Sequence, residues 1–417
     1  MRAPRILYVW DADYPWDVRA EKICQALTSA GARVHLACRN RQWRGLLEQR
    51  PEALVHRLRP WRWAGRRLDG LLSFPAFFSP RWRGHLRRVA REAAIDLIIV
   101  RDLPLCPTAI HAARRHRIPV VLDMAEDYSA LLRDVWATGR QQPFDFLIRH
   151  PRNATAVERW CLPRVDHVFT VVEESRDRLL RQGMKSERVE IVSNTPPLER
   201  TATTPPPAPV PGAALEVAYL GIMEIARGLV DLLEATAHLR NTSTPVHLHL
   251  VGDGRDLPLI RARALALGLA EPWVRFYGFI PSHADALGIV AGQQVGVLPH
   301  RVDGWSNTTI PNKLFDYMAA GLPVVSSDSA PCRRILDETG AGICYRGGDV
   351  TGLAAALAGM ADPSVWCRHA AAGIAAIRGR YHWEVDAGTL WHRITALLAE
   401  TPPPAARTRQ ADAAGPD

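Results

Sequence analysis

The chain has 417 residues, of which 47% are hydrophobic and 23% charged, so it is long enough to bury two cores rather than one. Its formal net charge of +9 favours anionic partners, and its seven cysteines include no Cys-x-x-Cys pair, which argues against a structural zinc site. No apolar run reaches the roughly 18 residues that a membrane-spanning helix needs, so we expect a cytoplasmic protein without such a helix.

The first half of the chain alternates short apolar runs with helical patterns. Residues 5–10 and 119–126 are predicted strands. Residues 18–30 carry apolar side chains at helical spacing before Gly31, a residue type that often follows a helix. Repetition of strand, helix and strand predicts a parallel sheet. We therefore predict a doubly wound domain over residues 1–194.

Residues 57–91 are unusually basic and aromatic. They contain ten arginines, three tryptophans and three phenylalanines, but only one acidic residue, Asp69. This mixture suits the surface of a membrane, where aromatic rings lie among headgroups and arginines bind lipid phosphates. The alternative is an arginine-rich helix pair whose aromatic side chains pack inward. We expect peripheral membrane contact through this segment.

The second half of the chain begins after a proline-rich stretch. Residues 195–214 are predicted to be an extended, exposed linker. The alternation of strands and helices then restarts and predicts a second doubly wound domain over residues 215–378. Residues 379–400 are a predicted helix that crosses back to the first domain, and residues 401–417 a disordered tail. The predicted fold class is α/β with two Rossmann-like domains.

The clearest functional signal is TTIPNKLFDYMAAGLPVVSS, residues 308–327. Its PNKLFDYMAAGLPVV segment resembles the donor-site signature of family 4 retaining glycosyltransferases, in the subgroup with Asn-Lys-Leu-Phe-Glu/Asp-Tyr-Met. A helix is predicted over 312–320. Asn312 would cap it and Lys313 would lie in its first turn, so a positive helix end and an ammonium group converge on a diphosphate. Asp316 would accept hydrogen bonds from ribose hydroxyls.

One position departs from this signature. The family carries an acidic pair spaced Glu-x7-Glu, and Asp316 matches its second member. The first falls on Thr308, which is not acidic. Ser306, Asn307 and the backbone of 307–310 are therefore the candidate substitutes for the sugar-contacting group.

Two further segments resemble the donor-side loops of the family. YLGIMEIARGL, residues 219–229, resembles a strand, a glycine-containing turn and a helix entry, with Gly221 in the turn and Arg227 able to bind diphosphate oxygens in pairs. VRFYGFI, residues 274–280, matches the strand whose following loop approaches the nucleobase in relatives, which makes Phe279 a candidate contact.

The N-terminal half resembles the family through two loops. DYPWDVRAEKICQAL is similar to a loop reading FPWDxRxEK, so Asp17 and Arg19 are expected to face the donor or the acceptor. DMAEDY, residues 123–128, stands at a strand end where relatives often carry Asp-x-His-Glu. Glu126 and Asp127 are therefore candidate partners of an acceptor hydroxyl, with helix capping as the alternative role.

The resemblance implies the GT-B architecture, two Rossmann-like domains facing across a cleft. It also implies retaining, hexosyltransferase-type transfer from a UDP- or GDP-sugar to a glycan or lipid-linked acceptor in bacterial polysaccharide biosynthesis. Arg227 and Lys313 would stabilise the departing diphosphate. We expect no metal ion, no other cofactor and no nucleic-acid partner, and association with the inner face of the cytoplasmic membrane. The alternatives are a nucleotide-sugar epimerase of the same fold and a catalytically silent scaffold.

Overall fold

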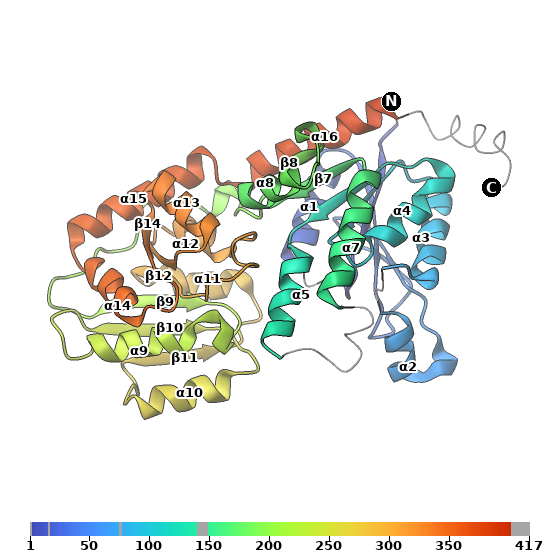
Figure 1. The fold of residues 1–417 in the computed structure, drawn as a ribbon. Coiled ribbons are helices and arrows are strands. Elements are labelled where there is room, and N and C mark those ends of the chain that lie inside the picture. Colours follow the sequence, from blue (N-terminus) through green and yellow to red (C-terminus); the bar gives the residue numbers. More distant parts are fainter. Residues whose placement is uncertain (1, 16, 75–76, 140–148, 402–417) are drawn as a thin grey trace. The chain divides into compact units, whose positions relative to one another are not determined.

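The computed structural model describes residues 2–15, 17–74, 77–139 and 149–401. It divides into two compact units. The N-terminal unit comprises Met1–Ser193 and Asp386–Asp417, and the C-terminal unit Asn194–Val385. Each unit is a sheet covered by helices on both faces (Figure 1). The predicted α/β fold class, with two doubly wound parallel sheets, is confirmed.

The N-terminal sheet has the strand order β3-β4-β2-β1-β5-β6-β7-β8. All its pairs are parallel except β3 with β4. Every residue of β5 and β6 is buried, as continuous apolar runs such as LIIV predict for strands covered on both faces. The strands are β1 (Arg5–Val9), β2 (Arg33–Cys38), β3 (Leu47–Gln49), β4 (Leu54–Arg57), β5 (Leu97–Arg101), β6 (Val120–Met124), β7 (His167–Thr170) and β8 (Val189–Ile191).

Two helices of this unit begin at a capping aspartate. Asp17 accepts a hydrogen bond from the Ala20 N–H at the start of α1, and Asp127 accepts one from Ala130 at the start of α5. The helices are α1 (Val18–Ser29), α2 (Gly65–Leu72), α3 (Pro80–Glu92), α4 (Cys106–Ala113), α5 (Tyr128–Ala137), α7 (Pro151–Cys161) and α8 (Glu173–Arg181).

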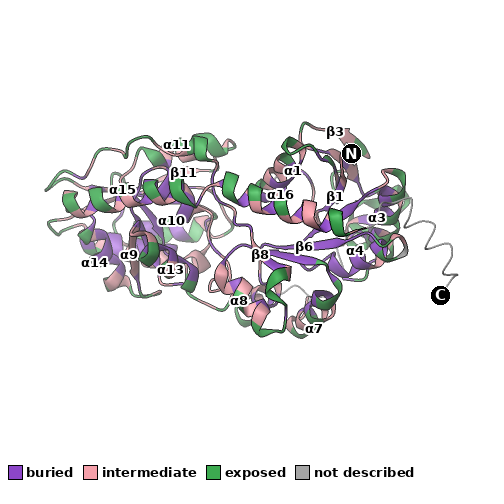
Figure 2. Ribbon diagram, turned by 90° about the horizontal axis from the view of Figure 1, so that it is seen from above, coloured by how far each residue is buried: buried purple, intermediate pink, exposed green. Residues whose placement is uncertain are grey.

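The C-terminal sheet has six strands in the order β11-β10-β9-β12-β13-β14, and all its pairs are parallel. The strands are β9 (Leu215–Leu220), β10 (Val246–Val251), β11 (Val274–Gly278), β12 (Val295–Leu298), β13 (Val324–Ser327) and β14 (Gly342–Tyr345). The inner strands β9, β10, β12 and β13 are mostly buried, whereas the edge strands β11 and β14 are only partly buried. Much of the exposed surface of the unit lies on its helices (Figure 2).

The helices of the C-terminal unit follow the predicted alternation. The helix predicted over 312–320 is α12, which is shorter. The helices are α9 (Leu229–Leu239), α10 (Leu257–Ala266), α11 (His283–Ala291), α12 (Lys313–Ala319), α13 (Ala330–Thr339), α14 (Val350–Gly359) and α15 (Pro363–Gly379). The helix that follows, α16 (Trp383–Glu400), has only its first three residues in this unit.

Two segments connect the units along the chain. The proline-rich stretch clusters with the C-terminal unit; it contains the short 3-10 helix η5 (Leu198–Arg200), and Thr195 and Pro196 within it are buried. Most of α16 belongs to the N-terminal unit, where Arg393 donates a hydrogen bond of 3.0 Å to Glu190. The predicted disordered tail lies outside the described residues, apart from Thr401.

Within the described ranges, none of the helices combines the length and the apolar character needed to cross a bilayer.

Candidate functional site

The candidate site lies at the carboxyl ends of the strands in the C-terminal unit, where the order of the sheet reverses. From β9 the chain proceeds to β10 and β11 on one side, whereas β12 starts the run to β13 and β14 on the other. Doubly wound sheets bind ligands at such a switch point, outside the carboxyl ends of the strands. Gly221 follows β9 directly, and Pro299 and His300 follow β12.

Three basic side chains gather at this edge. Arg227 ends the 3-10 helix η6 (Ile225–Arg227), His300 follows β12, and Lys313 begins α12. Burial, and then the charges of Arg227 and Lys313, lower the pKa of His300 to about 3. Burial also lowers the pKa of Lys313; Asp316 opposes this shift and Arg227 adds to it. The three groups therefore interact electrostatically, and together they form an environment suited to an anion.

Two buried nitrogen atoms beside these cations lack hydrogen-bond partners among the described residues. They are Nδ1 of His300 and Nε1 of Trp305. A buried polar atom left unpaired costs about 1–3 kcal/mol, which a ligand oxygen could recover. Trp305 also contacts Arg227, whose guanidinium carbon lies 5.2 Å from the centre of its ring.

The loop that carries Trp305 is held by its own polar groups. The Ser306 N–H donates a 2.7 Å hydrogen bond to Asp303, and the Asn307 side chain accepts one of 2.8 Å from the Ala330 N–H. Thr308 Oγ1 donates to the Trp305 carbonyl at 3.1 Å. Thr308, which replaces the acidic residue of the family motif, therefore bonds to the loop that positions Trp305.

The turn before α9 brings the chain very close to the end of β12. Gly228 has a left-handed backbone with φ of +73°, and a Cβ atom placed on it would lie 1.7 Å from the carbonyl oxygen of Pro299. Only glycine fits this position. This close approach helps to place Arg227 beside His300.

The motif helix differs from the prediction in one respect. Asn312 stands at the cap position of α12, but its side chain makes no capping hydrogen bond. Its φ of −51° and ψ of −31° are helical, whereas a side-chain cap needs an extended backbone. The capping role predicted for Asn312 is therefore wrong. Lys313 lies in the first turn as predicted, and the structure places Asp316 in that turn as well. The Tyr317 hydroxyl accepts a hydrogen bond from the Leu220 N–H at 2.9 Å, which joins α12 to β9.

Phe279, the predicted nucleobase contact, follows β11 in the same unit and is 70% exposed. Gly221, at the end of β9, and Phe279, after β11, lie at the same edge of the sheet but two strands apart, because β10 lies between β9 and β11.

The N-terminal unit also collects charged residues at its switch point, between β1 and β5. Asp11 lies just beyond β1, and Arg101 and Asp102 lie at the end of β5. The Arg101 guanidinium donates to Asp17 at 2.6 Å and lies 4.9 Å from the centre of the Trp10 ring. Burial, and then the neighbouring Asp102, raise the pKa of Asp11 to about 6.

The four predicted acceptor-side residues occupy different environments. Asp17 caps α1 and pairs with Arg101, and the Glu126 N–H donates to Asp102. Arg19 is only 3% exposed and forms an ion pair of 2.6 Å with fully buried Asp123. Asp127 is 2% exposed and caps α5, the alternative role predicted for it. Arg19 and Asp127 therefore lie inside the unit.

The sequence interpretation missed several of these groups. His300, whose Nδ1 is buried beside two cations, was not among the predicted site residues, and neither were Trp305, Asp11 and Asp102. The sequence does mark the two acids by their positions. Asp11 directly follows the strand predicted over residues 5–10, and Asp102 follows the apolar run of β5 after one residue.

Across the part of the chain that the structure describes, no three or more His, Cys, Asp and Glu side chains are grouped so that they could hold a metal ion.

Comparison with protein families gives two matches. Residues 17–195 match a family described as "Glycosyl transferase 4-like domain", and residues 214–362 match "Glycosyl transferases group 1".

Curated relatives match over part of their length. The phosphatidyl-myo-inositol mannosyltransferase of Mycobacterium leprae is 31% identical over 221 residues, which cover 52% of this chain and 56% of that protein. The glycogen synthase of Mycobacterium tuberculosis is 25% identical over 299 residues, 70% of this chain and 66% of that protein. The matched region thus spans somewhat over half of the first relative and just under two thirds of the second.

Solved structures match over almost the whole chain. Sucrose-phosphate synthase from Thermosynechococcus elongatus superposes with a TM-score of 0.75 at 16% identity, covering 96% of this chain and all of that one. The Anabaena protein HepE, solved in complex with UDP, gives a TM-score of 0.66 at 15% identity over 94% of this chain and all of that one. These likenesses concern the fold. Together with the two family matches on successive halves of the chain, they show that the protein belongs to the GT-B glycosyltransferases of the family 4 type.

Proposed function

We propose that this protein is a retaining glycosyltransferase that moves a sugar from a UDP- or GDP-sugar to a glycan or lipid-linked acceptor in polysaccharide biosynthesis. The observation that carries the proposal is the gathering of Arg227, Lys313 and the unpaired Nδ1 of His300 at the switch point of the C-terminal sheet. A nucleotide-diphosphate sugar supplies the negative charge that this environment lacks.

The relatives support this class of chemistry by their own activities. One is a mannosyltransferase, and another is a lipopolysaccharide 1,6-galactosyltransferase of Salmonella typhimurium. HepE has been solved with UDP and with UDP-glucose. For the present protein these relatives support only a class of donor, namely a hexose carried on a nucleoside diphosphate.

In the proposed reaction the bond between the anomeric carbon and the diphosphate oxygen breaks, and the acceptor oxygen bonds to the anomeric carbon on the same face. Negative charge grows on the departing diphosphate. Arg227 can donate two parallel hydrogen bonds to it, and Lys313 adds a nearby ammonium charge. We propose that these two side chains supply the stabilisation and that no metal ion is used.

The remaining donor contacts follow from position. Gly221, which follows β9 directly, is proposed to contact the donor through its backbone. Asp316 lies three residues after Lys313 in α12, and exposed Phe279 is proposed to contact the base. For the acceptor, Glu126 and Asp17 are proposed at the edge of the N-terminal sheet. Asp11 joins them, because its raised pKa of about 6 suits a group that accepts a hydroxyl proton.

We further propose that the segment of residues 57–91 contacts a membrane. Its tryptophans divide between two environments. Trp82 is fully buried and donates from Nε1 to the Ser73 carbonyl, whereas Trp63 is 78% exposed and stacks against Trp61 with ring centres 5.7 Å apart. The inward-packing alternative therefore describes Trp82, and the membrane proposal rests on Trp61, Trp63 and the exposed leucines of α2.

Thermal-shift measurements with UDP-, GDP-, ADP- and CMP-sugars test the donor site. Wild type is compared with Arg227→Ala and Lys313→Ala, and with Lys185→Ala, which removes an exposed lysine from the other unit, as the matched control. The proposal expects stabilisation by sugars of one base, lost in the first two variants and kept in the control. Absence of a shift with every nucleotide sugar would overturn it and favour a silent scaffold. Conversion of the nucleotide sugar in the absence of an acceptor would favour the epimerase.

A further inference from the structure

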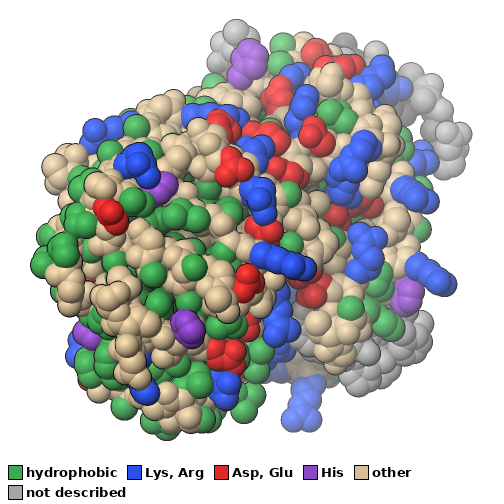
Figure 3. Space-filling view, turned by 60° about the vertical axis from the view of Figure 1, so that its left-hand side comes forward, with side chains coloured by type: hydrophobic (Ala, Val, Ile, Leu, Met, Phe, Trp, Pro, Cys, Tyr) green, Lys and Arg blue, Asp and Glu red, His purple; other side chains and the backbone are tan. Residues whose placement is uncertain are grey.

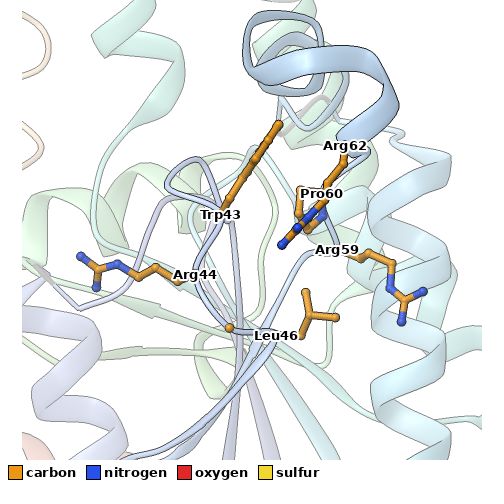
Figure 4. A pocket seen from close by; sticks show the side chains of 7 residues that line it. Trp43, Arg44, Leu46, Arg59, Pro60 and Arg62 are labelled. Atoms are coloured by element: carbon orange, nitrogen blue, oxygen red, sulfur yellow. The ribbon is translucent and has the colours of Figure 1, made fainter.

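The N-terminal unit contains a pocket that the proposed donor site does not use. Its volume is about 430 Å³, within the usual range of ligand pockets, roughly 300–1,000 Å³. One wall is the segment after β2 and the other is the segment after β4, so the pocket opens at the carboxyl edge of this sheet. Its lining includes Trp43, Arg44, Leu46, Arg59, Pro60 and Arg62 (Figure 4).

A buried carboxylate holds the two walls together. Asp69 is 2% exposed and accepts hydrogen bonds from Nε1 of Trp43 at 3.2 Å and from the Trp61 N–H at 2.8 Å. It also forms a 2.7 Å ion pair with Arg81, which in turn donates to the Arg59 carbonyl. Burial opposes ionisation, but these hydrogen bonds hold the pKa of Asp69 below its usual value. The walls are therefore fixed before any ligand arrives.

The wall formed by the segment after β2 is also held by hydrogen bonds from two other side chains of the N-terminal unit. The Asn40 side chain accepts a hydrogen bond from the Arg44 N–H at 2.8 Å and donates to the Arg44 carbonyl at 3.0 Å. Arg57, which is buried, donates to the Gly45 carbonyl at 3.1 Å. Such bracing is typical of a binding loop rather than of a mobile surface turn.

The charge of the pocket is not balanced. Arg44, Arg59 and Arg62 form no ion pair with a carboxylate among the described residues, and no acidic side chain lines the pocket. Asp69, the nearby acid, is already bonded to Arg81. Elsewhere, on the face drawn in Figure 3, basic and acidic side chains lie intermingled. Arg62 points between Trp43 and Pro60, while Arg44 and Arg59 extend to either side of the pocket (Figure 4).

We infer that this pocket binds a phosphate group of a ligand, held by Arg62 with Arg44 and Arg59 at its margins. The guanidinium fork matches phosphate oxygens in pairs, and the pocket is large enough for an organic group beyond the phosphate, which would lie against Trp43 and Pro60. This site is separate from the proposed donor site. The phosphate can come from two sources, the headgroup of an anionic lipid or a phosphorylated glycan acceptor.

Calorimetric titration tests the inference with two soluble probes, glycerol 3-phosphate and dihexanoyl phosphatidic acid. Wild type is compared with the double variant Arg59→Gln/Arg62→Gln. The control is Arg33→Gln/Arg114→Gln, which removes two exposed arginines of the same unit. Binding to at least one probe should weaken by at least about tenfold in the first variant and stay unchanged in the control. Each titration is repeated with Lys313→Ala, which should leave this binding intact and separates it from the donor site.

Co-sedimentation with vesicles distinguishes the two sources. Phosphatidylcholine vesicles with and without phosphatidylglycerol are the probes. Binding to the anionic vesicles that is lost in Arg59→Gln/Arg62→Gln assigns the pocket to lipid headgroups. Binding of a soluble probe without vesicle binding assigns it to the acceptor. Equal binding by wild type and this variant, or no binding of any probe to wild type, would overturn the inference without touching the nucleotide-sugar result.

Discussion

The guanidinium carbon of Arg227 lies 5.2 Å from the centre of the Trp305 ring, so an indole face supports the cation that we assign to the donor diphosphate. The two residues lie in loops after different strands, β9 and β12. Their contact therefore depends on the switch point itself. A cation over an indole ring is stabilised by roughly 0.5–2 kcal/mol. The contact also restricts the rotamers of Arg227 before the ligand binds, so less side-chain entropy is lost on binding.

Replacing Trp305 should weaken donor binding through Arg227. We expect Trp305→Leu to raise the Kd of the preferred nucleotide sugar by roughly 3- to 30-fold, because the guanidinium loses its support. Trp305→Phe, which keeps an aromatic face, should retain more of the affinity than Trp305→Leu does. Calorimetric Kd values for both variants check this, and equal losses in the two would show that the ring face is irrelevant.

His300 should make the C-terminal unit sensitive to acid. Its pKa is about 3 in the folded protein and about 6.5 in an unfolded chain, so between these values the unfolded chain binds more protons. Stability should therefore rise with pH across this window and level off above it. For this residue alone the loss at pH 5 relative to pH 8 is on the order of 2 kcal/mol.

Denaturant unfolding at pH 5 and pH 8 measures this effect. The variant His300→Asn has no titrating group at the position, so its stability should change less between the two pH values than that of wild type. Identical pH dependence in the two proteins would show that His300 is not buried beside Arg227 and Lys313 as described.

The close approach at Gly228 gives a sharp test of the turn that carries Arg227. Gly228→Ala would place a Cβ atom 1.7 Å from the Pro299 carbonyl oxygen and force a left-handed backbone on alanine. We expect a loss of at least about 2 kcal/mol, because both backbone segments must move. Gly288→Ala is the matched control: it lies within α11 with open space around it and should be neutral or stabilising by up to about 1 kcal/mol. Equal melting temperatures of the two variants would contradict the described turn.

Sequence alone predicted the alternation of strands and helices, the two parallel sheets and the first-turn position of Lys313, because these follow from apolar periodicity and from one specific motif. It did not predict that Arg19 would turn inward. Asp123 stands near the end of a fully buried strand, and a buried carboxylate must find a cation. Only the fold shows that Arg19, more than 100 positions away, provides it. The Asn312 cap failed for a local reason, since the chain enters α12 already in helical geometry.

That buried pair carries its own prediction. Arg19→Ala would leave Asp123 unpaired in the core apart from the hydroxyl of Tyr8, which donates to it at 2.8 Å. Breaking a buried ion pair from one side costs about 3–5 kcal/mol, so we expect a large fall in the denaturant midpoint of the N-terminal unit. The pKa of Asp123 is held low by Arg19, against the effect of burial. The stability from this pair is therefore present above pH 4 and is lost only in stronger acid. A wild-type midpoint in Arg19→Ala at pH 7 would contradict this assignment.

The exposed apolar side chains of residues 61–72 give the last test, that of membrane contact. Trp63 is 78% and Leu71 62% exposed, beside a strongly basic surface, and insertion of each into the headgroup region should contribute on the order of 1 kcal/mol. Trp63→Ser/Leu71→Ser should therefore bind vesicles containing phosphatidylglycerol roughly 30-fold more weakly than wild type. The control Leu259→Ser/Leu265→Ser removes two leucines of similar exposure from α10, 60% and 70%, and should bind as wild type does. Trp82 is left unchanged because it is buried, and its loss would report on folding. Equal vesicle binding by the two double variants would show that α2 and its flanking residues do not enter the membrane.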